Sequence, residues 1–376
     1  MKFLILIDQL GVGGAEKQAI LFADYLQNKK NQIVEIWAFL PGDGTAKVLC
    51  DKYSIKTKVI GYFRGLARYL SPLQVFNYKK VFDSYKPDIV MGYTNMPNLL
   101  FGFIWKKIGA KFFVWGQQGI DASGYKFNST GLKAIRNTPC FISNSINGAE
   151  FLKNELNIPN EKIHIIYNGP EKVYPVFTPR EWYEKLGISE YHFKAIMTAH
   201  IALRKDHETL IRAWKIVVDN QKTKNMNPIL IFAGILGNAT QHLIHLCLDL
   251  NIYANIKFIG NTNDIQGLNR SCDIAVLSSN TEGLPNSILE AMNDGLSIVG
   301  TDIPGIREAV GEENYQYLAP PKNPEILAEK IILFANNPDL RKRVGTLNKD
   351  RVEKFFQLDE MCEKTFGLII RNIEKH

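Results

Sequence analysis

The chain has 376 residues, more than one hydrophobic core usually supports, so two domains are expected. Its composition, 45% hydrophobic and 22% charged, excludes a disordered or fibrous chain. The net charge of +7 is uneven, since residues 1–180 carry +10 and residues 181–376 carry −3. A basic half favours an anionic ligand or an anionic membrane surface, and no nucleic acid is expected, because no stretch resembles a nucleic-acid-binding module.

The amino-terminal stretch "MKFLILIDQL" is too short for a signal peptide or a membrane span, and no later apolar run reaches spanning length. The five cysteines are scattered and never spaced as CxxC, which indicates reduced thiols in a folded core. These features predict a cytoplasmic protein.

Short apolar runs alternate with stretches of helical period, which indicates βαβ units and parallel sheets covered on both faces. The first series of predicted strands covers residues 2–7, 32–40, 56–60, 88–93, 111–116, 140–143 and 162–167. After a proline-bearing stretch at 168–179, a second series covers 194–199, 228–234, 256–260, 273–278 and 296–301. Beyond residue 325 the pattern is helical nearly to the end.

The pattern predicts an α/β protein of two Rossmann-like, doubly wound domains facing across a cleft. We expect an N-terminal, acceptor-side domain over residues 1–175 and a C-terminal domain over 176–355. Residues 356–376 are expected to form a terminal helix that crosses back to the first domain.

The first predicted strand leads into "LGVGGAEKQ", residues 10–18. A dinucleotide-binding fingerprint would need a glycine three residues after Gly13, where Glu16 stands, so hydride chemistry loses support. Gly13 and Gly14 still allow backbone N–H groups to approach an oxygen-rich ligand at the start of the next helix. A tight strand-to-helix turn without a ligand is the alternative.

The stretch "EGLPNSILEAMNDGLSIVGTDIPGIRE" covers residues 282–308. A helix is expected to start near Pro285, because proline suits the first helical turn. Glu282 then lies just before the helix N-terminus, and Glu290 lies within the helix. An anion could bind at that N-terminus, while the second carboxylate could accept hydrogen bonds from vicinal hydroxyls such as those of a ribose.

This stretch resembles the donor-site signature of the family 4 retaining glycosyltransferases of the GT-B fold, of the type that builds bacterial surface polysaccharides. The resemblance extends over nearly the whole chain. Four more segments are similar to family motifs, namely "GGAE" at 13–16, "SNSINGAEFL" at 143–152, "IIYNG" at 165–169 and "RKDHETLIRAW" at 204–214.

The resemblance implies roles for five residues of the second domain. Glu290 would contact the ribose hydroxyls of a nucleotide diphosphate sugar, UDP- or GDP-linked. Glu282 would lie beside the transferred sugar, with Gly283 and Leu284 offering backbone donors. Lys205 would neutralise the donor diphosphate, for which a compact ammonium on a long stem is suited.

In the first domain, the resemblance implies that Gly13 and Gly14 face the diphosphate and the acceptor. The chain also departs from the family pattern. Five residues before Lys205 the family commonly carries an arginine, whereas this chain has His200, with Arg204 as a candidate substitute in catalysis. His200 is therefore kept as a donor-binding candidate.

A second departure is Gln118, which stands where many members place a histidine near the acceptor. A glutamine cannot shuttle a proton, so the departing phosphate would have to take the acceptor proton, as is often proposed for this fold. Gln118 and Asp121 are expected on the acceptor side. No carboxylate pair fits a metal site, so we expect no metal and no cofactor beyond the nucleotide sugar.

Basic and aromatic residues interleave at 61–82 and 101–113, as they do in helices at membrane surfaces. We therefore expect a saccharide or lipid-linked saccharide acceptor, used in polysaccharide or lipopolysaccharide biosynthesis, and peripheral attachment to the inner face of the cytoplasmic membrane. Burial of these helices in the core is the alternative.

Two other functions stay open: a non-catalytic nucleotide-sugar- or carbohydrate-binding subunit, and a nucleotide-sugar 2-epimerase or phosphorylase.

Overall fold

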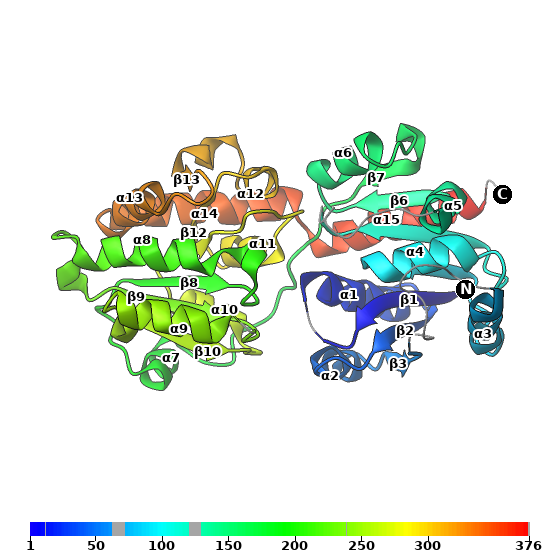
Figure 1. Ribbon diagram of the computed structural model, residues 1–376, viewed down its shortest axis with the longest axis horizontal. Coiled ribbons are helices and arrows are strands. Elements are labelled where there is room, and N and C mark those ends of the chain that lie inside the picture. The colour runs from blue at the N-terminus through cyan, green and yellow to red at the C-terminus, as the bar shows by residue number, and fades with distance from the viewer. Residues whose placement is uncertain (12, 62–71, 120–128, 238, 375–376) are drawn as a thin grey trace. The chain divides into compact units, whose positions relative to one another are not determined.

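The computed structural model describes residues 1–11, 13–61, 72–119, 129–237 and 239–374 (Figure 1). The chain divides into two compact units, Met1–Gly169 with Leu358–His376, and Pro170–Gln357. The sequence predicts the two boundaries between these units after residues 175 and 355. Each unit contains one parallel sheet, so the expected α/β fold with two Rossmann-like domains is confirmed.

The first unit is built on a seven-stranded sheet in the order β3-β2-β1-β4-β5-β6-β7. Its strands are β1 (Lys2–Gln9), β2 (Ile33–Leu40), β3 (Lys56–Val59), β4 (Ile89–Gly92), β5 (Phe112–Gln117), β6 (Cys140–Ser143) and β7 (Ile163–Ile165). The strand order reverses between β1 and β4. In doubly wound sheets this reversal is where loops at the carboxyl edge diverge and ligands bind.

Successive side chains of these strands point to opposite faces, so the sheet builds two separate cores. In β1, Phe3 and Ile5 enter one core, while Leu4 and Leu6 enter the other. The first core is covered by α1 (Gly14–Asn28), α2 (Thr45–Lys52) and α15 (Leu358–Ile373). The second is covered by α3 (Pro72–Asp83), α4 (Asn95–Ile104), α5 (Ser129–Asn137) and α6 (Ile146–Asn154).

The C-terminal helix α15 belongs to the first unit although it follows the second in sequence. Ile369 is fully buried in the first core, and the Phe366 ring packs against Phe3 with centroids 6.3 Å apart. An ion pair between Lys30 and Glu363, at 2.9 Å, joins α1 to α15. Helix α15 is therefore part of the first core.

The second unit contains a six-stranded sheet in the order β10-β9-β8-β11-β12-β13. Its strands are β8 (Lys194–Thr198), β9 (Ile229–Ala233), β10 (Ile256–Gly260), β11 (Ile274–Leu277), β12 (Ser297–Thr301) and β13 (Leu318–Ala319). Here the order reverses between β8 and β11. β13 was not predicted from the sequence, because a strand of two residues is too short to show a periodic hydrophobic pattern.

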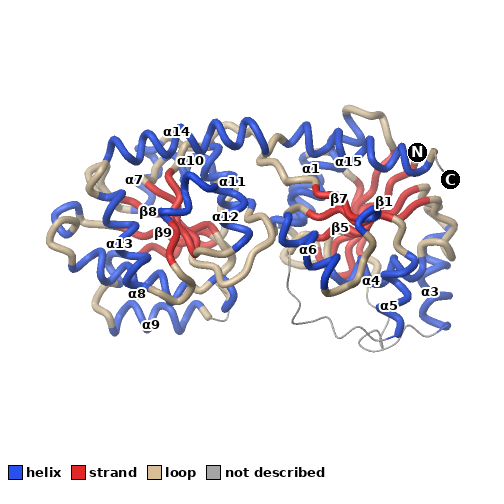
Figure 2. Tube along the Cα trace, turned by 90° about the horizontal axis from the view of Figure 1, so that it is seen from above, coloured by secondary structure: helices blue, strands red, loops and turns tan. Residues whose placement is uncertain are grey.

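Helices cover both faces of the second sheet (Figure 2). They are α7 (Pro179–Leu186), α8 (His207–Asp219), α9 (Thr240–Asp249), α10 (Ile265–Arg270), α11 (Asn286–Asn293), α12 (Pro304–Val310), α13 (Pro324–Ala335) and α14 (Pro338–Phe355). All five cysteines are free, and four of them are buried. Within the described residues, no helix combines the length and apolarity that crossing a membrane requires.

Candidate functional site

The second-unit residues singled out by the sequence gather at the strand-order reversal. His200, Arg204 and Lys205 follow β8, and Glu282 follows β11, its hydrogen-bonded neighbour. All four therefore lie at the carboxyl edge of the sheet, where open α/β sheets bind ligands.

The loop after β8 is held in place by its neighbour after β9. Ala199 N donates to Ala233 O at 2.9 Å, and Ile201 N donates to Ile235 O at 3.0 Å. Gly234 has a φ of +148°, and a Cβ added there would lie 2.2 Å from Ala199 O. Because only glycine permits this approach, Gly234 sets the course of the loop that carries Lys205.

A buried ion pair forms the centre of the site. Lys205 Nζ donates to Glu282 Oε1, and their side chains are only 13% and 8% exposed. The same carboxylate oxygen accepts a hydrogen bond from Ser279 Oγ at 2.6 Å. A buried charge needs such partners, because an unpaired ion costs several kcal/mol in a medium of low dielectric.

Further hydrogen bonds hold the two loops against each other. Ser278 Oγ shares its one proton between the carbonyl oxygens of Lys205 and Asp206, at 3.1 and 2.9 Å. Asn280 N donates to Arg204 O at 2.8 Å. Asp206 adopts a left-handed conformation with φ +49° and caps helix α8 through its side chain. These contacts give Lys205 and Glu282 a common rigid support.

Gly283 and Leu284 link Glu282 to helix α11, which begins at Asn286 with Pro285 as its N-cap, one residue later than expected. Among the described residues, neither amide of this pair donates a hydrogen bond to the backbone or to a side chain. A Cβ added at Gly305 would lie 1.9 Å from Gly283 O, so α12 packs directly onto this segment. Among the described residues, these two amides beside the carboxylate are therefore without an acceptor.

Glu290 lies in α11 and is 9% exposed. One turn further, the Asp294 side chain is only 2% exposed, and its pKa is raised to about 6, chiefly by burial and also by the charge of Glu290. Asn269 and Arg270 oppose that rise by bonding the Asp294 carboxylate. The structure thus places two carboxylates, at 282 and 290, on the segment that follows β11.

The side chains of His200 and Arg204 are exposed. Among the described residues, the Arg204 guanidinium makes no hydrogen bond or ion pair, so it is available to an anion. His207, at the start of α8, is buried against Phe232 with ring centroids 5.1 Å apart. Burial, reinforced by Lys205, lowers the pKa of His207 to about 4, so this histidine is a neutral core residue.

In the first unit, the amide of Gly13, in the loop after β1, has an acceptor within the chain. Gly13 N donates to Glu16 Oε2 at 3.1 Å, so the amide that is expected to face a phosphate is bonded to the carboxylate of its own helix. Burial raises the pKa of Glu16, and the charge of Asp8 adds to that rise. Gly13 can bind an anion only if Glu16 releases it. Gly14 is exposed at the first position of α1.

Gln118 follows β5 and belongs to a cluster of carboxamides. Its Oε1 accepts hydrogen bonds from Asn144 Nδ2 and Asn168 Nδ2, both at 3.2 Å. Asn144 and Asn168 follow β6 and β7, so the cluster lies along the carboxyl edge of this sheet. Asp121, the other acceptor-side candidate, lies outside the described residues.

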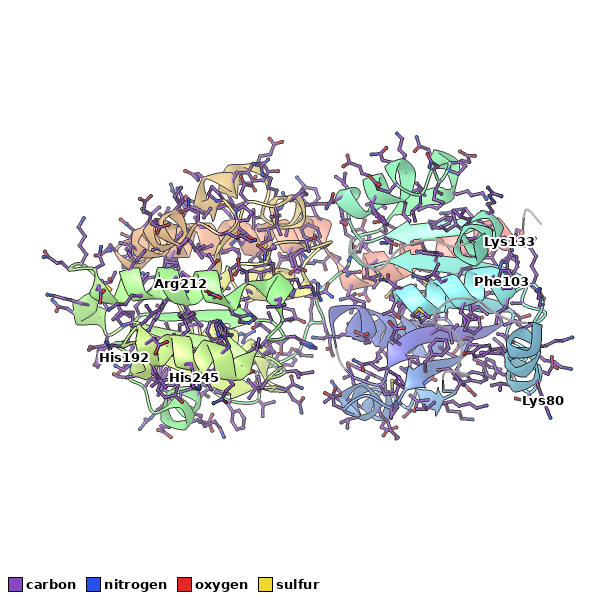
Figure 3. The ribbon with its side chains drawn as sticks, in the orientation of Figure 1. Lys80, Phe103, Lys133, His192, Arg212 and His245 are labelled. Atoms are coloured by element: carbon purple, nitrogen blue, oxygen red, sulfur yellow. The ribbon has the colours of Figure 1, made fainter. Side chains whose placement is uncertain are left out.

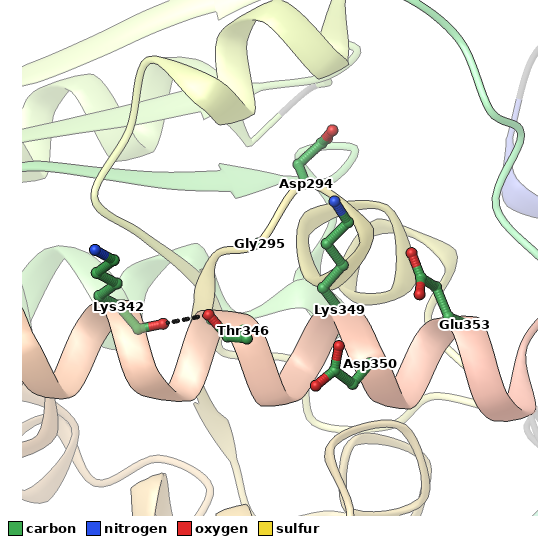
Figure 4. Close-up of a pocket in the computed structure, with 8 residues that line it drawn as sticks. Asp294, Gly295, Lys342, Thr346, Lys349, Asp350 and Glu353 are labelled. Carbon is green, nitrogen blue, oxygen red and sulfur yellow. Dashed lines mark hydrogen bonds between the residues drawn. The ribbon is translucent and has the colours of Figure 1, made fainter.

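A pocket of about 560 Å³ elsewhere in the second unit is a separate feature (Figure 4). It is lined by residues of α14, among them Lys342 and Lys349, and by Asp294 and Gly295. Gly295 lies two residues before β12, so the pocket lies at the amino edge of the sheet, opposite to Lys205. In the described part of the chain, no cluster of histidine, cysteine or carboxylate side chains is arranged to hold a metal.

Sequence reasoning found Lys205 and Glu282 but missed Ser279, Asn144 and Asn168. Serine and asparagine are common in loops, and only contact with a candidate residue reveals their part in a site. Their nearness in the sequence to residues already singled out could have indicated them. Ser279 precedes Glu282 by three residues, and the two asparagines lie in "SNSINGAEFL" and "IIYNG". Chemically, the second-unit site offers a cation and free amides to an anion, with carboxylates for hydroxyl groups.

Two curated relatives act on lipid-linked sugars, by their names. The N,N'-diacetylbacillosaminyl-diphospho-undecaprenol alpha-1,3-N-acetylgalactosaminyltransferase of Campylobacter jejuni is 26% identical over 369 residues, covering 92% of this chain and 94% of that protein. The UDP-Gal:alpha-D-GlcNAc-diphosphoundecaprenol alpha-1,3-galactosyltransferase of Escherichia coli is 29% identical over 154 residues, covering 40% of this chain and 39% of its own.

A solved structure shares the fold over the full length. Anabaena HepE in complex with UDP-glucose superposes with a TM-score of 0.83 at 20% identity, covering 99% of this chain and 100% of HepE. The sequence pattern described as Glycosyltransferase Family 4 matches residues 12–171, and that described as Glycosyl transferases group 1 matches residues 179–351. The chain therefore belongs to the family 4 glycosyltransferases, which have the GT-B fold.

Proposed function

We propose that this protein transfers a sugar from a UDP- or GDP-linked donor to a saccharide or lipid-linked saccharide acceptor, with retention of the anomeric configuration. The observation that carries the proposal is the buried pair of Lys205 and Glu282 at the strand-order reversal of the second unit. The UDP-glucose complex of HepE supports a nucleotide sugar as the donor. The names of the Campylobacter and Escherichia relatives support a lipid-linked acceptor in polysaccharide assembly.

The chemistry requires stabilisation of a leaving group. Breaking the bond between the anomeric carbon and the diphosphate leaves negative charge on the phosphate oxygens. Lys205, the exposed Arg204 and the amides of Gly283 and Leu284 supply positive charge and N–H donors at that position. We propose that these groups suffice without a metal ion, and that a departing phosphate oxygen takes the acceptor proton.

The acceptor would approach over the basic first unit. Helices α3, α4 and α5 carry Lys80, Phe103 and Lys133 at one end of this unit (Figure 3). Lys107 lies over the Phe103 ring at 4.6 Å, and Lys106 lies over the Trp105 ring at 5.1 Å. Trp105 is buried in the second core and Phe103 packs against it, so the exposed lysines, and not the aromatic rings, are the groups that would meet an anionic membrane surface. Part of the stretch that suggested this surface, residues 62–71, lies outside the described residues.

The test is mass spectrometry after incubation with nucleotide sugars and with diphosphoundecaprenol-linked saccharides. The proposal expects an acceptor heavier by one sugar residue, whose anomeric configuration, read by NMR, equals that of the donor. An epimerised donor with an unchanged acceptor would instead establish the 2-epimerase. No conversion of any donor, together with tight nucleotide-sugar binding, would establish the non-catalytic subunit.

Metal independence needs its own measurement. Turnover is compared in EDTA and after addition of Mg²⁺ or Mn²⁺. Unchanged turnover in EDTA supports neutralisation by Lys205 and Arg204. Turnover that disappears in chelator and returns with either ion contradicts this part of the mechanism.

A further inference from the structure

The carboxylate of Glu282 is held through only one of its oxygens. Oε1 accepts hydrogen bonds from Lys205 Nζ and from Ser279 Oγ, the latter at 2.6 Å. Among the described residues, Oε2 makes no hydrogen bond, and it is not a buried atom. Oε2 is therefore the oxygen of this carboxylate that can accept a hydrogen bond from a ligand.

We propose that Ser279 is a positioning residue, which fixes the rotation of the Glu282 carboxylate so that Oε2 faces a hydroxyl of the donor sugar. This inference rests on the proposed function, because it needs a nucleotide sugar in the site. A carboxylate whose one oxygen is bonded to a fixed donor such as Ser279 Oγ cannot rotate without breaking that bond. Preorganised groups of this kind contribute more to binding than mobile ones do.

Ser279 is itself fixed. Its side chain is fully buried, and its carbonyl oxygen accepts a hydrogen bond from Thr301 Oγ1 at the end of β12. A serine hydroxyl carries one proton, and here that proton is donated to Glu282. Hydrogen bonds therefore link Thr301, at the end of β12, to Ser279, and Ser279 to the carboxylate of Glu282.

Lys205 alone would not give the same restraint. Its ammonium carries three protons, so it can bond Glu282 and two phosphate oxygens together. When a diphosphate binds, the long lysine stem is free to adjust to the anion, whereas the short serine side chain is not. Losing Ser279 should therefore affect recognition of the sugar more than recognition of the nucleotide.

The experiment compares Ser279→Ala with Ser279→Thr, which retains a hydroxyl, and with Ser271→Ala. Ser271 is a matched control, because it is a buried serine of the same unit whose hydroxyl donates to Gly267 O at 2.7 Å, away from the site. Calorimetry measures binding of UDP, of GDP and of their glucose, galactose, mannose and N-acetylhexosamine conjugates. The conjugate that wild-type protein binds best is then used with each variant.

Ser279→Ala should weaken binding of that conjugate by about fivefold or more, and binding of the bare nucleotide by less than about twofold. Ser279→Thr should restore most of the loss, and Ser271→Ala should show none. Equal losses for both ligands, or none, would overturn the positioning role. If Ser279→Ala does not fold, Thr301→Val must show the same selective loss. Failure of wild-type protein to bind any conjugate would instead remove the proposed function, and this inference with it.

Discussion

At the residue scale, the Lys205–Glu282 pair joins stability to ligand binding. The side chains are 13% and 8% exposed, so removing one charge leaves the other buried without its partner. Such a loss typically costs about 3–5 kcal/mol, whereas neutralising both groups often costs little. Lys205→Met should therefore lower the free energy of unfolding sharply, and the double variant Lys205→Met with Glu282→Gln should recover much of it.

The double variant separates the two roles of the pair. Denaturant unfolding measures stability, and calorimetry with UDP and GDP measures binding. We expect the double variant to bind nucleotide far more weakly than wild-type protein despite its recovered stability. Wild-type affinity in the double variant would show that Lys205 does not contact the diphosphate.

His207 predicts a pH dependence of stability. Its pKa is lowered from 6.5 to about 4, chiefly because the ring is buried. Between these values the unfolded chain binds a proton that the folded chain does not, so stability falls as the pH drops from about 6.5 to 4. The shift corresponds to about 3 kcal/mol over this range.

A substitution without a titrating group should abolish that loss. We expect His207→Phe to flatten the unfolding free energy between pH 7 and 4 relative to wild-type protein. His245→Phe is the matched control, because His245 is exposed (Figure 3), and it should leave the pH dependence unchanged. Parallel curves for wild-type protein and His207→Phe would refute a neutral, buried His207.

At the element scale, Asp264 joins the start of the second unit to helix α10. Its carboxylate accepts hydrogen bonds from Val176 N at 2.8 Å, Phe177 N at 3.0 Å and Trp182 Nε1 at 2.9 Å. It also caps α10 through Gly267 N. Burial favours a raised pKa for Asp264, but these hydrogen bonds outweigh it and hold the pKa below 3.8.

Asp264→Ala would leave several of these donors without a partner. We expect it to destabilise the second unit by about 3 kcal/mol or more. Because the pKa of Asp264 is lowered on folding, its contribution is complete above about pH 4 and is lost as the pH falls through the folded value. Denaturant unfolding at pH 7 and pH 3 checks both points, since the variant's deficit should shrink at the lower pH.

Helix α15 makes a second prediction at this scale. Ile369 is fully buried in the first core beside Phe3 and Ile5, so Ile369→Ala should cost about 2–5 kcal/mol through the cavity it leaves. The exposed Lys364→Ala is the control, since it lies on the same helix. Hydrogen exchange should show the loss of protection in β1 and α1. Exchange that rises only in the second unit would contradict the assignment of α15 to the first.

The described strands other than β13 were predictable, because most of them are short apolar runs bounded by turn residues, and β6 was predicted with its observed bounds, 140–143. Buried polar contacts were not predictable in this way. The pair of Lys205 and Glu282 joins residues 77 positions apart, and only the parallel order of β8 and β11 brings them together. The Glu16 cap on Gly13 was also missed, because the same residues fit both a phosphate loop and a capping box.

At the scale of the whole molecule, the charge asymmetry predicts attachment to anionic lipid through the first unit. The structure refines which lysines to test. Lys111 forms an ion pair with Asp88 at 2.8 Å, so its charge is already compensated. Lys106, Lys107 and Lys133 are exposed, and among the described residues none of them forms an ion pair.

Each lysine near an anionic surface contributes about 1 kcal/mol, so changing Lys106, Lys107 and Lys133 to glutamate should strongly reduce sedimentation with anionic vesicles at low salt. The matched control changes Lys222, Lys224 and Lys322, three exposed lysines of the second unit, and should sediment as wild-type protein does. Both variants should keep wild-type affinity for UDP or GDP, because none of the six residues belongs to the loops after β8 and β11, which carry Lys205 and Glu282. Salt should release the wild-type protein as the Debye length falls below about 8 Å. If wild-type protein ignores anionic vesicles at low salt, membrane attachment is refuted, and an acceptor that is free in solution becomes the better inference.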